Sequence, residues 1–451
     1  MKKVIGVAVA ASLVAGMAFA DVAVTLNARV RSNMYHQQKY DNGNKKTYTF
    51  DLEGNSKHGG SGDMTDVLGF SAKTDYAGVV LEIAAQRNSS STSVDKFYSD
   101  TNGTETAIYY KNSDGEYKSL SVLSGQATPF DFDGAYYGFM KFGGLKLTFG
   151  TFDSRFVNRY NVTAGEAGLL DSNDIAKYGT ALLNGKLAGK KWGNFLKDAN
   201  NASAVAGSKS VSVVADYTFD DVAGGKLLVK GGLLGSKYKT DEDSADDKKY
   251  QRAGYVGELD FENDSIKLQG LVKAPNEKQT VFGVFVEPKL MAELPLALGF
   301  SYGTDSDKDG KYNNSTGDNV TAMAFDARVG YLVNDQLKVS TVAKYETVNS
   351  KAADKSISAL AVAGEVSYIV NDLATVFGDI GYYNYNLGGE DTFAANKYSI
   401  VKVRPGVVLN AGAGARVTAA FQFDSNSGDA VDSNSVVKTE WSIPVIFRVK
   451  L

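Results

Sequence analysis

The stretch VKTEWSIPVIFRVKL, from Val437 to Leu451, alternates between two kinds of side chain. One set is almost entirely apolar: Val437, Thr439, Trp441, Ile443, Val445, Phe447, Val449 and Leu451. The other set contains the polar residues Lys438, Glu440, Ser442, Arg448 and Lys450. Successive side chains of a strand point to opposite faces, so the stretch predicts a strand with one face for lipid and one for water.

The first mature strand mirrors the last one. Val22, Val24, Leu26, Ala28 and Val30 alternate with Thr25, Asn27, Arg29 and Arg31. Two chain ends that both form full strands can pair and abolish the edges of a sheet. The two ends therefore predict a closed barrel.

Between these ends, strand-like runs repeatedly reach an aromatic residue on the apolar parity and then turn. The residues concerned are Tyr76, Phe142, Phe219, Phe261, Tyr331 and Tyr368. Aromatic side chains at one depth are typical of a membrane interface, so these six predict a periplasmic aromatic girdle.

Short turns alternate along the chain with longer polar loops. The predicted turns are Ala77-Gly78, Gly143-Gly144, Asp220 to Gly224, Asn263-Asp264, Ala292 to Leu294, Asn334-Asp335, Asn371-Asp372 and Ala411 to Gly414. Asn-Asp, Ala-Gly and Gly-Gly suit turn positions that need positive φ. We predict an all-β, transmembrane, antiparallel up-and-down β-barrel of about 18 strands, with 16 as the alternative count. Residues 21–451 are expected to form this single domain.

The N-terminus predicts export. Lys2 and Lys3 precede an apolar run that ends in Ala18-Phe19-Ala20, the pattern of a cleaved secretory signal peptide over residues 1–20. The run is short for a membrane anchor, and no later stretch has the length of a spanning helix. The expected location is the bacterial cell outer membrane.

Three loops are expected to be long, at about 36–65, 88–132 and 153–208. The third is too apolar for a freely solvated segment, since it contains Leu169, Leu170, Leu182, Leu183, Trp192 and Phe195. It either folds into the barrel and narrows the pore, or forms an external cap or a subunit contact. The sequence leaves these alternatives open.

Charged residues on the polar parity are the candidate pore lining. They are Arg29, Arg31, Glu82, Lys146, Arg252, Glu258, Asp326, Arg328, Glu365, Asp379, Lys402, Arg404, Arg416 and Arg448. Mixed signs predict a polar channel, and the basic excess predicts a weak anion preference. Alternatively, the charges neutralise each other across neighbouring strands.

Catalytic and cofactor chemistry has no support in the sequence. The chain contains no Cys, and both of its His residues, His36 and His58, fall in the first predicted loop, where we expect solvated side chains. The acidic stretches lack the spacing of a calcium loop, and no glycine-rich phosphate loop is present. We expect no enzyme activity, cofactor, metal or nucleic-acid partner.

The signal peptide, the amphipathic strands, the long third loop and the terminal strand together resemble bacterial outer-membrane porins with 16 to 18 strands. The resemblance covers the whole mature chain and implies a passive channel for ions and small hydrophilic solutes, surrounded by outer-membrane lipid. It also implies an inward-folded third loop, a homotrimer, and a last strand read by the outer-membrane assembly machinery. Leu451 departs from the pattern, because an aromatic residue usually ends such chains. The alternative function is a barrel that displays its loops for adhesion or for host and surface interaction.

Overall fold

The computed structural model contains strands and turns over the residues it describes. These are 21–40, 42–52, 66–85, 98–100, 107–111, 117–119, 136–151, 153–154, 204–205, 212–234, 254–276, 278–306, 319–351, 355–387, 397–412, 414–428 and 437–450. In this part of the chain, no helix is long and apolar enough to cross a membrane.

The strands of the first half alternate with long connections. Their bounds are β1 Asp21–Tyr40, β2 Lys45–Leu52, β3 Asp66–Lys73, β4 Ala77–Ala85, β5 Tyr98–Asp100, β6 Ala107–Lys111, β7 Tyr117–Ser119, β8 Tyr136–Phe142, β9 Leu145–Thr151, β10 Asp153–Ser154, β11 Ala204–Val205, β12 Ser212–Val222 and β13 Gly225–Leu234.

The strands of the second half are longer and follow one another closely. Their bounds are β14 Gly254–Glu262, β15 Ile266–Asn276, β16 Gln279–Pro288, β17 Leu296–Asp305, β18 Val320–Leu332, β19 Leu337–Ser350, β20 Lys355–Asn371, β21 Ala374–Asn386, β22 Lys397–Gly412, β23 Ala415–Ala420, β24 Gln422–Gly428 and β25 Val437–Lys450.

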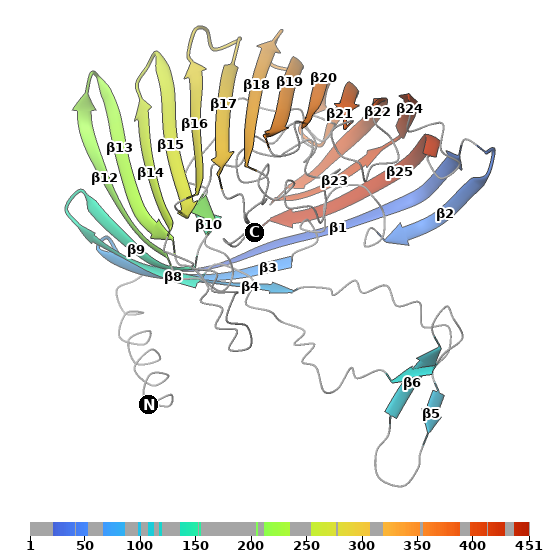
Figure 1. The fold of residues 1–451 in the computed structure, drawn as a ribbon, viewed down its shortest axis with the longest axis horizontal. Helices are drawn as coiled ribbons and strands as arrows, with labels where there is room; N and C mark the ends of the chain where they lie inside the picture. The colour runs from blue at the N-terminus through green and yellow to red at the C-terminus, as the bar shows by residue number, and fades with distance from the viewer. Residues whose placement is uncertain are drawn as a thin grey trace.

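One antiparallel sheet closes on itself, because β1 pairs with β3 on one side and with β25 on the other. Figure 1 shows the first strand in blue beside the last strand in red. The described sheet has 20 strands. Since β2 and β3 pair with successive parts of the same side of β1, and β23 and β24 are two parts of one strand, 18 strands form the wall. The predicted closure and the count of 18 are confirmed.

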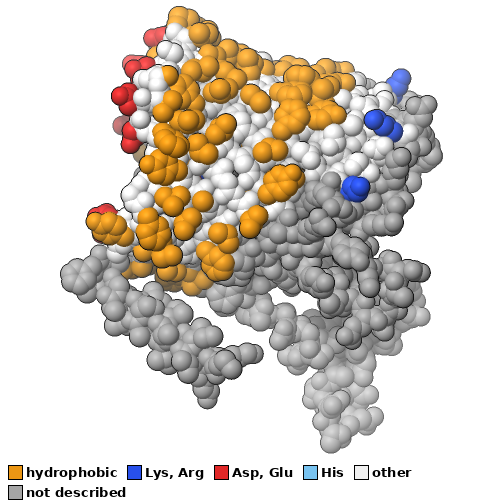
Figure 2. Space-filling model, turned by 60° about the vertical axis from the view of Figure 1, so that its left-hand side comes forward, with side chains coloured by type: hydrophobic (Ala, Val, Ile, Leu, Met, Phe, Trp, Pro, Cys, Tyr) orange, Lys and Arg blue, Asp and Glu red, His pale blue; other side chains and the backbone are white. Residues whose placement is uncertain are grey.

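The two faces of the wall differ in chemistry. Outward positions carry large apolar side chains that are exposed, such as Phe149, Leu259 and Ile380. Figure 2 shows them as a broad orange band, with acidic residues along one edge and a few basic residues at the opposite edge. The most buried apolar side chains face inward instead, for example Ala361 and Val342. Such a wall places its apolar surface outside and its polar surface inside, as a membrane barrel requires.

A β-bulge interrupts the seam between β1 and β25. The pairing Asn33↔Pro444 is followed by His36↔Ser442, so one extra residue is inserted into β1. A single inserted residue reverses the facing of every later side chain on that strand. Beyond the bulge, His36 therefore faces inward and Tyr35 faces outward.

Two prolines explain why the penultimate strand is divided. The register is unchanged from Ala419↔Val445 to Gln422↔Ser442, so β23 and β24 are continuous. Phe421 lies between them; its N–H donates to the carbonyl of Pro405 at 2.9 Å. Proline has no N–H to return that bond, and by the same register Pro444 lies opposite Ala420 on the other neighbouring strand. The ladder is therefore weakened on both sides at one level.

The short turns are of two kinds. Those at Gly143, at Asp221 to Gly224 and at Gly412 to Gly414 contain residues with positive φ, as predicted, whereas the Asn turns use a side-chain acceptor. Asn334 Oδ1 accepts from the N–H groups of Gln336 and Leu337 at 2.8 and 2.7 Å. The turns at Asn263 and Asn371 are built in the same way. The expectation of positive φ at the Asn-Asp turns was wrong, because none of these residues appears among the described positions with positive φ. A side-chain acceptor satisfies the turn amides without that conformation.

The predicted turn at Ala77-Gly78 was also wrong. The turn is Thr74 to Tyr76, where Thr74 Oγ1 accepts from the N–H groups of Tyr76 and Ala77. Gly78 belongs to β4, and a Cβ at this position would meet the ring of Phe139. The glycine is thus needed for cross-strand packing and not for a turn.

The long loops are described only in part. The first predicted loop, 36–65, begins later than expected, because β1 continues to Tyr40 and pairs with β2. In the second loop, β6 pairs with β7, and β5 joins them on the other side of β6. In the third, β10 pairs with β11. Residues 1–20 and the apolar positions Leu169, Leu170, Leu182, Leu183, Trp192 and Phe195 lie outside the described residues.

Candidate functional site: the inner wall of the barrel

Ten of the predicted pore-lining residues lie at described positions on the inward face. They are Lys146, Glu258, Asp326, Arg328, Glu365, Asp379, Lys402, Arg404, Arg416 and Arg448. Arg252 and the side chains of Arg29, Arg31 and Glu82 lie outside the described residues. Several of the ten are buried, such as Glu365 at 2 % and Asp379 at 4 % exposure. The sequence had predicted that these side chains face the water of a channel.

Charges on neighbouring strands pair across the wall at β13 and β14. Lys230 Nζ lies 3.3 Å from Glu258 Oε1 and 3.6 Å from Asp260 Oδ2. The side chain of Glu258 is fully buried, and its second oxygen has no hydrogen-bond partner. Lys230 thus lies close to two carboxylates that share the inward face of β14.

A second paired region spans β21 to β24. Arg404 Nε lies 3.6 Å from Asp379 Oδ2, and Lys402 Nζ lies 3.7 Å from Asp424 Oδ2. Lys402 also lies over the ring of Tyr383, 5.3 Å from its centroid, which adds a cation–π contact. Here both cations come from β22 and the carboxylates come from the strands on either side of it.

The most deeply buried ion pair lies on one strand. Lys344 and Glu346 of β19 are 3.6 Å apart, and their side chains are 1 % and 0 % exposed. Long charged side chains are almost never fully buried unless they are paired. This pair therefore belongs to the packed wall and is not a solvated charge.

His36 was expected to be a solvated loop residue, and that expectation was wrong. It lies on β1, is 4 % exposed, and its Nε2 lies 2.5 Å from Oε1 of Glu440 on β25. The bulge in β1 directs it inward, and simple alternation along the sequence gives no sign of that bulge. The sequence signal that was present is Glu440, an acidic residue on the inward parity of the last strand.

Taken together, the described inner wall is a polar surface whose carboxylates have cations on the same or adjacent strands. Neutralisation between neighbours removes much of the net charge that a solute would meet. Among the described residues, no group of three His, Cys, Asp or Glu side chains could hold a metal ion. The arrangement suits contact with hydrated solutes.

The six aromatic residues predicted as a girdle lie at the short-turn rim. Tyr76, Phe142, Phe219, Tyr331 and Tyr368 are between 41 % and 74 % exposed, and Phe261 is half-buried. Each faces outward or lies in the adjoining turn, as an interfacial aromatic side chain should.

The opposite end of the seam carries an outward aromatic cluster. Tyr35 stacks on Trp441 with ring centroids 4.3 Å apart. Trp441 Nε1 donates to Gln37 Oε1 at 3.2 Å, and Gln37 Nε2 donates to the Tyr35 hydroxyl at 3.0 Å. The polar atoms of both rings are thus satisfied while their faces remain available to an apolar environment.

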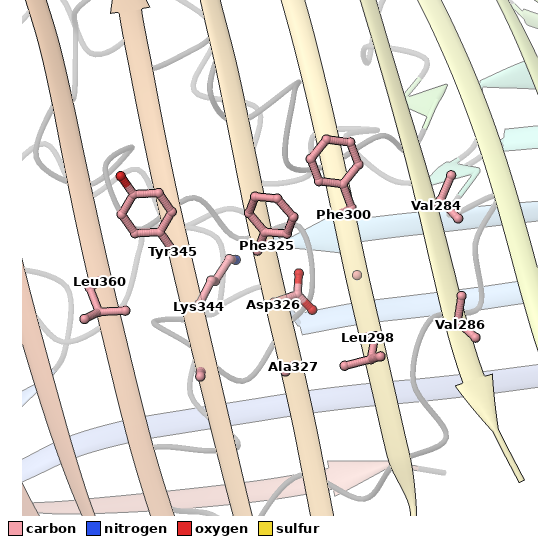
Figure 3. A pocket seen from close by; sticks show the side chains of 12 residues that line it. Val284, Val286, Leu298, Phe300, Phe325, Asp326, Ala327, Lys344, Tyr345 and Leu360 are labelled. Carbon is pink, nitrogen blue, oxygen red and sulfur yellow. The ribbon is translucent and has the colours of Figure 1, made fainter.

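A groove of about 440 Å³ crosses the outer wall between β16 and β20. Figure 3 shows Phe300, Phe325 and Tyr345 side by side above it, with Ala327 below them. The groove arises because Ala327 and its cross-strand neighbour Ala343 are small. Asp326 and Lys344 border the groove with their backbone, because their side chains face the inside of the barrel.

Comparisons with known proteins add an architectural likeness. No protein-family model and no curated protein matches the sequence. Among solved structures, the chain is similar to the anion-selective porin from Comamonas acidovorans, with 13 % identity, a TM-score of 0.48, and coverage of 96 % of this chain and 100 % of that one. It is also similar to OmpT, an outer membrane protein of Vibrio cholerae, with 12 % identity, a TM-score of 0.46, and coverage of 96 % and 98 %.

A third solved structure is OccK2 of Pseudomonas aeruginosa in complex with glucuronate, with 9 % identity, a TM-score of 0.44, and coverage of 96 % and 98 %. These values are low, so the assignment rests on the strand pairing of the chain itself. That pairing gives an even number of antiparallel strands, closure between the first and last strand, short turns at one rim and an outward apolar band. The chain is a closed, antiparallel, membrane-spanning β-barrel.

Proposed function

We propose that the chain forms a water-filled channel in a bacterial outer membrane, through which ions and small hydrophilic solutes diffuse passively. One observation carries this proposal: 18 strands close into a wall that is apolar outside and polar inside. Barrels of 8 strands fill with their own side chains, whereas those of about 16 to 18 strands leave an aqueous channel.

Selectivity is expected to be weak. The paired carboxylates of the inner wall reduce the field of any single charge, and the basic excess among the predicted lining residues favours anions. The loop over residues 153–208 is the candidate constriction of the pore. Residues 1–20 serve as the export signal, and the last strand serves as the signal for the outer-membrane assembly machinery. A homotrimer completes the proposal.

Single-channel recording of the purified chain in planar phospholipid bilayers tests the channel. Discrete conductance steps are expected, with a reversal potential in a salt gradient that indicates a slight anion preference. The absence of any conductance step from a correctly folded protein would contradict the channel, and clear cation selectivity would contradict the anion preference.

Deletion of residues 165–199 tests the constriction separately. A larger conductance than that of the full chain is expected if the loop narrows the pore. An unchanged conductance would place the constriction elsewhere. Chemical cross-linking in detergent, read out as a ladder ending at three copies, tests the oligomeric state.

A further inference from the structure

The inner wall at the short-turn end of β8 and β9 carries two lysines directly opposite each other. Lys141 and Lys146 are cross-strand partners on neighbouring strands, which lie side by side in Figure 1. Both face the lumen, because Lys146 shares its face with Asp216 while Phe142 and Phe149 are exposed on the outer face. Like charges directly opposite each other in a sheet repel and lower its stability. An anion between the two lysines would remove this repulsion.

An aromatic ring lies within reach of both lysines. Phe139 precedes Lys141 by two residues on β8 and therefore shares its inward face. The ring centroid lies 5.8 Å from Lys141 Nζ and 5.3 Å from Lys146 Nζ, so both ammonium groups make cation–π contacts with it. The two cations thus converge on one point of the wall.

A glycine on the neighbouring strand gives the ring its place. Gly78 of β4 is the cross-strand partner of Phe139, and a Cβ on Gly78 would meet ring atoms of Phe139. The ring therefore lies over bare backbone, and any larger residue at position 78 would displace it. Phe139 is only half-buried, so part of its apolar surface remains open on the inner wall.

The two lysines are accessible and their surroundings have an excess of positive charge. Lys141 is exposed, and the side chain of Lys146 is 36 % exposed. The neighbouring carboxylate belongs to Asp216 of β12, whose Oδ2 lies 3.9 Å from Lys146 Nζ. Two lysines and one aspartate leave an excess of one positive charge. The inner wall around Glu365 and Asp379 differs, because those side chains are buried.

We propose that Phe139, Lys141 and Lys146 form a binding subsite for small monocarboxylates with a planar apolar body, of which benzoate is the simplest. The carboxylate lies between the two ammonium groups, and the ring of the ligand contacts the ring of Phe139. A single negative charge matches the positive excess, and the pair of rings adds a contact that an inorganic anion cannot make. The inference rests on the proposed channel for the route by which the anion arrives, whereas binding itself needs no conduction.

Fluorine NMR of para-fluorobenzoate tests binding to the full chain, folded in detergent micelles without a membrane potential. The resonance is expected to shift and broaden in a saturable way as the native chain is added. The double variant Lys141→Met and Lys146→Met keeps the apolar stems of both side chains and removes both charges. Its affinity should be lower by about fivefold or more, as expected for the loss of exposed ion pairs.

Lys226→Met is the matched control for the loss of charge. Lys226 is an exposed cation on the inward face of β13 at the same rim, and it lies beside Asp220 and not beside Phe139. This variant is expected to keep the native affinity. Neutral para-fluorobenzyl alcohol measures partition into the micelles, which should be equal for all variants.

Competition between two unlabelled carboxylates isolates the contribution of the ring. Benzoate should displace the probe from the native chain at a lower concentration than acetate does. In Phe139→Leu the two competitors should become equally effective, because the ring contact is lost and the charges remain. Equal displacement by benzoate and acetate from the native chain would overturn the proposal.

Equal affinity of the native chain and the double lysine variant would also overturn it. If the double variant does not fold, which its mobility on gels before and after heating reveals, the single variants are measured, and each should lose part of the affinity. Conductance steps in planar bilayers report on the channel separately. A chain that conducts without binding the probe contradicts only the subsite, and a chain that binds without conducting contradicts only the channel.

Discussion

His36 of the first strand and Glu440 of the last strand meet 2.5 Å apart on the inner face of the seam that closes the barrel. Both belong to strands whose pairing joins the two ends of the chain. Removing one partner deprives the other of this 2.5 Å contact, at a cost of about 1–3 kcal/mol. We expect His36→Ala and Glu440→Ala each to lower the free energy of unfolding by about this amount, measured by urea titration in vesicles. The double variant should lose less than the sum, and strict additivity would show that the contact does not couple the strands.

Trp441 offers a second test of the seam, on its outer face. Replacement by Leu removes the stack on Tyr35 and the hydrogen bond to Gln37 while keeping an apolar side chain. Because an aromatic pair contributes about 0.5–1.5 kcal/mol beyond buried area, we expect a destabilisation of that order. Trp441→Phe retains a ring and should recover most of it. Equal stability of the Leu and Phe variants would exclude the stack as a source of stability.

Gly406 and Gly378 predict opposite outcomes for the same substitution. A Cβ at Gly406 would collide with the ring of Phe377, its cross-strand partner, whereas a Cβ at Gly378 meets nothing within 4 Å. Overpacking costs about 1–3 kcal/mol, so Gly406→Ala should unfold at clearly lower urea concentration. Gly378→Ala should stay within about 0.5 kcal/mol of the native chain. Combining Gly406→Ala with Phe377→Leu should restore part of the loss, and failure of this rescue would assign the effect to the backbone.

In the turn that contains Asn334 and Asp335, we expect only Asn334 to contribute to stability. Asn334→Ala removes an acceptor for two backbone N–H groups and should cost about 0.5–1.5 kcal/mol per lost bond. Asp335→Ala is the control, with an expected change of less than about 0.5 kcal/mol. Refolding yield and urea titration of both variants give the comparison. A larger effect at Asp335 than at Asn334 would refute the assignment of the turn.

Arg404 and Asp379 test the electrostatics of the inner wall. The Asp379 side chain is fully buried, so Arg404→Met removes the cation 3.6 Å from its carboxylate and should cost about 3–5 kcal/mol. Adding Asp379→Leu removes that carboxylate and should recover most of the loss. If the double variant recovers none of the loss, packing, and not charge, is responsible.

Alternation of side chains was sufficient to predict the barrel and the strands of its wall. The register from β12 to β25 keeps the predicted inward charges at described positions on one face, as at Asp326↔Lys344 and Asp379↔Arg404. The alternation of inward and outward side chains remains readable along the whole chain, because each strand is short and each turn begins a new strand with its own alternation. The aromatic residues before the short turns likewise mark one rim, as their exposure shows.

Features that depend on pairing between distant strands could not be predicted in this way. The bulge before His36 exists only in relation to β25, and one inserted residue leaves no mark on the composition of β1. The division at Phe421 depends on Pro405 and Pro444, which lie on two other strands. The Ala77-Gly78 assignment failed for a related reason, because Gly78 serves the ring of Phe139 on a neighbouring strand.

Several strands are longer than a membrane requires. A tilted strand crosses the hydrocarbon with about 9–11 residues, whereas β20 has 17 and β22 has 16. The surplus stands above the lipid as paired sheet, since the β19–β20 ladder continues to Ser350↔Lys355 and the β21–β22 ladder to Asn386↔Lys397. Proteases cleave extended, unpaired chain, so a protease added from that side should find no cleavage site along this raised part of the wall. Limited proteolysis of intact cells would then report on the loops alone and leave the rim uncut.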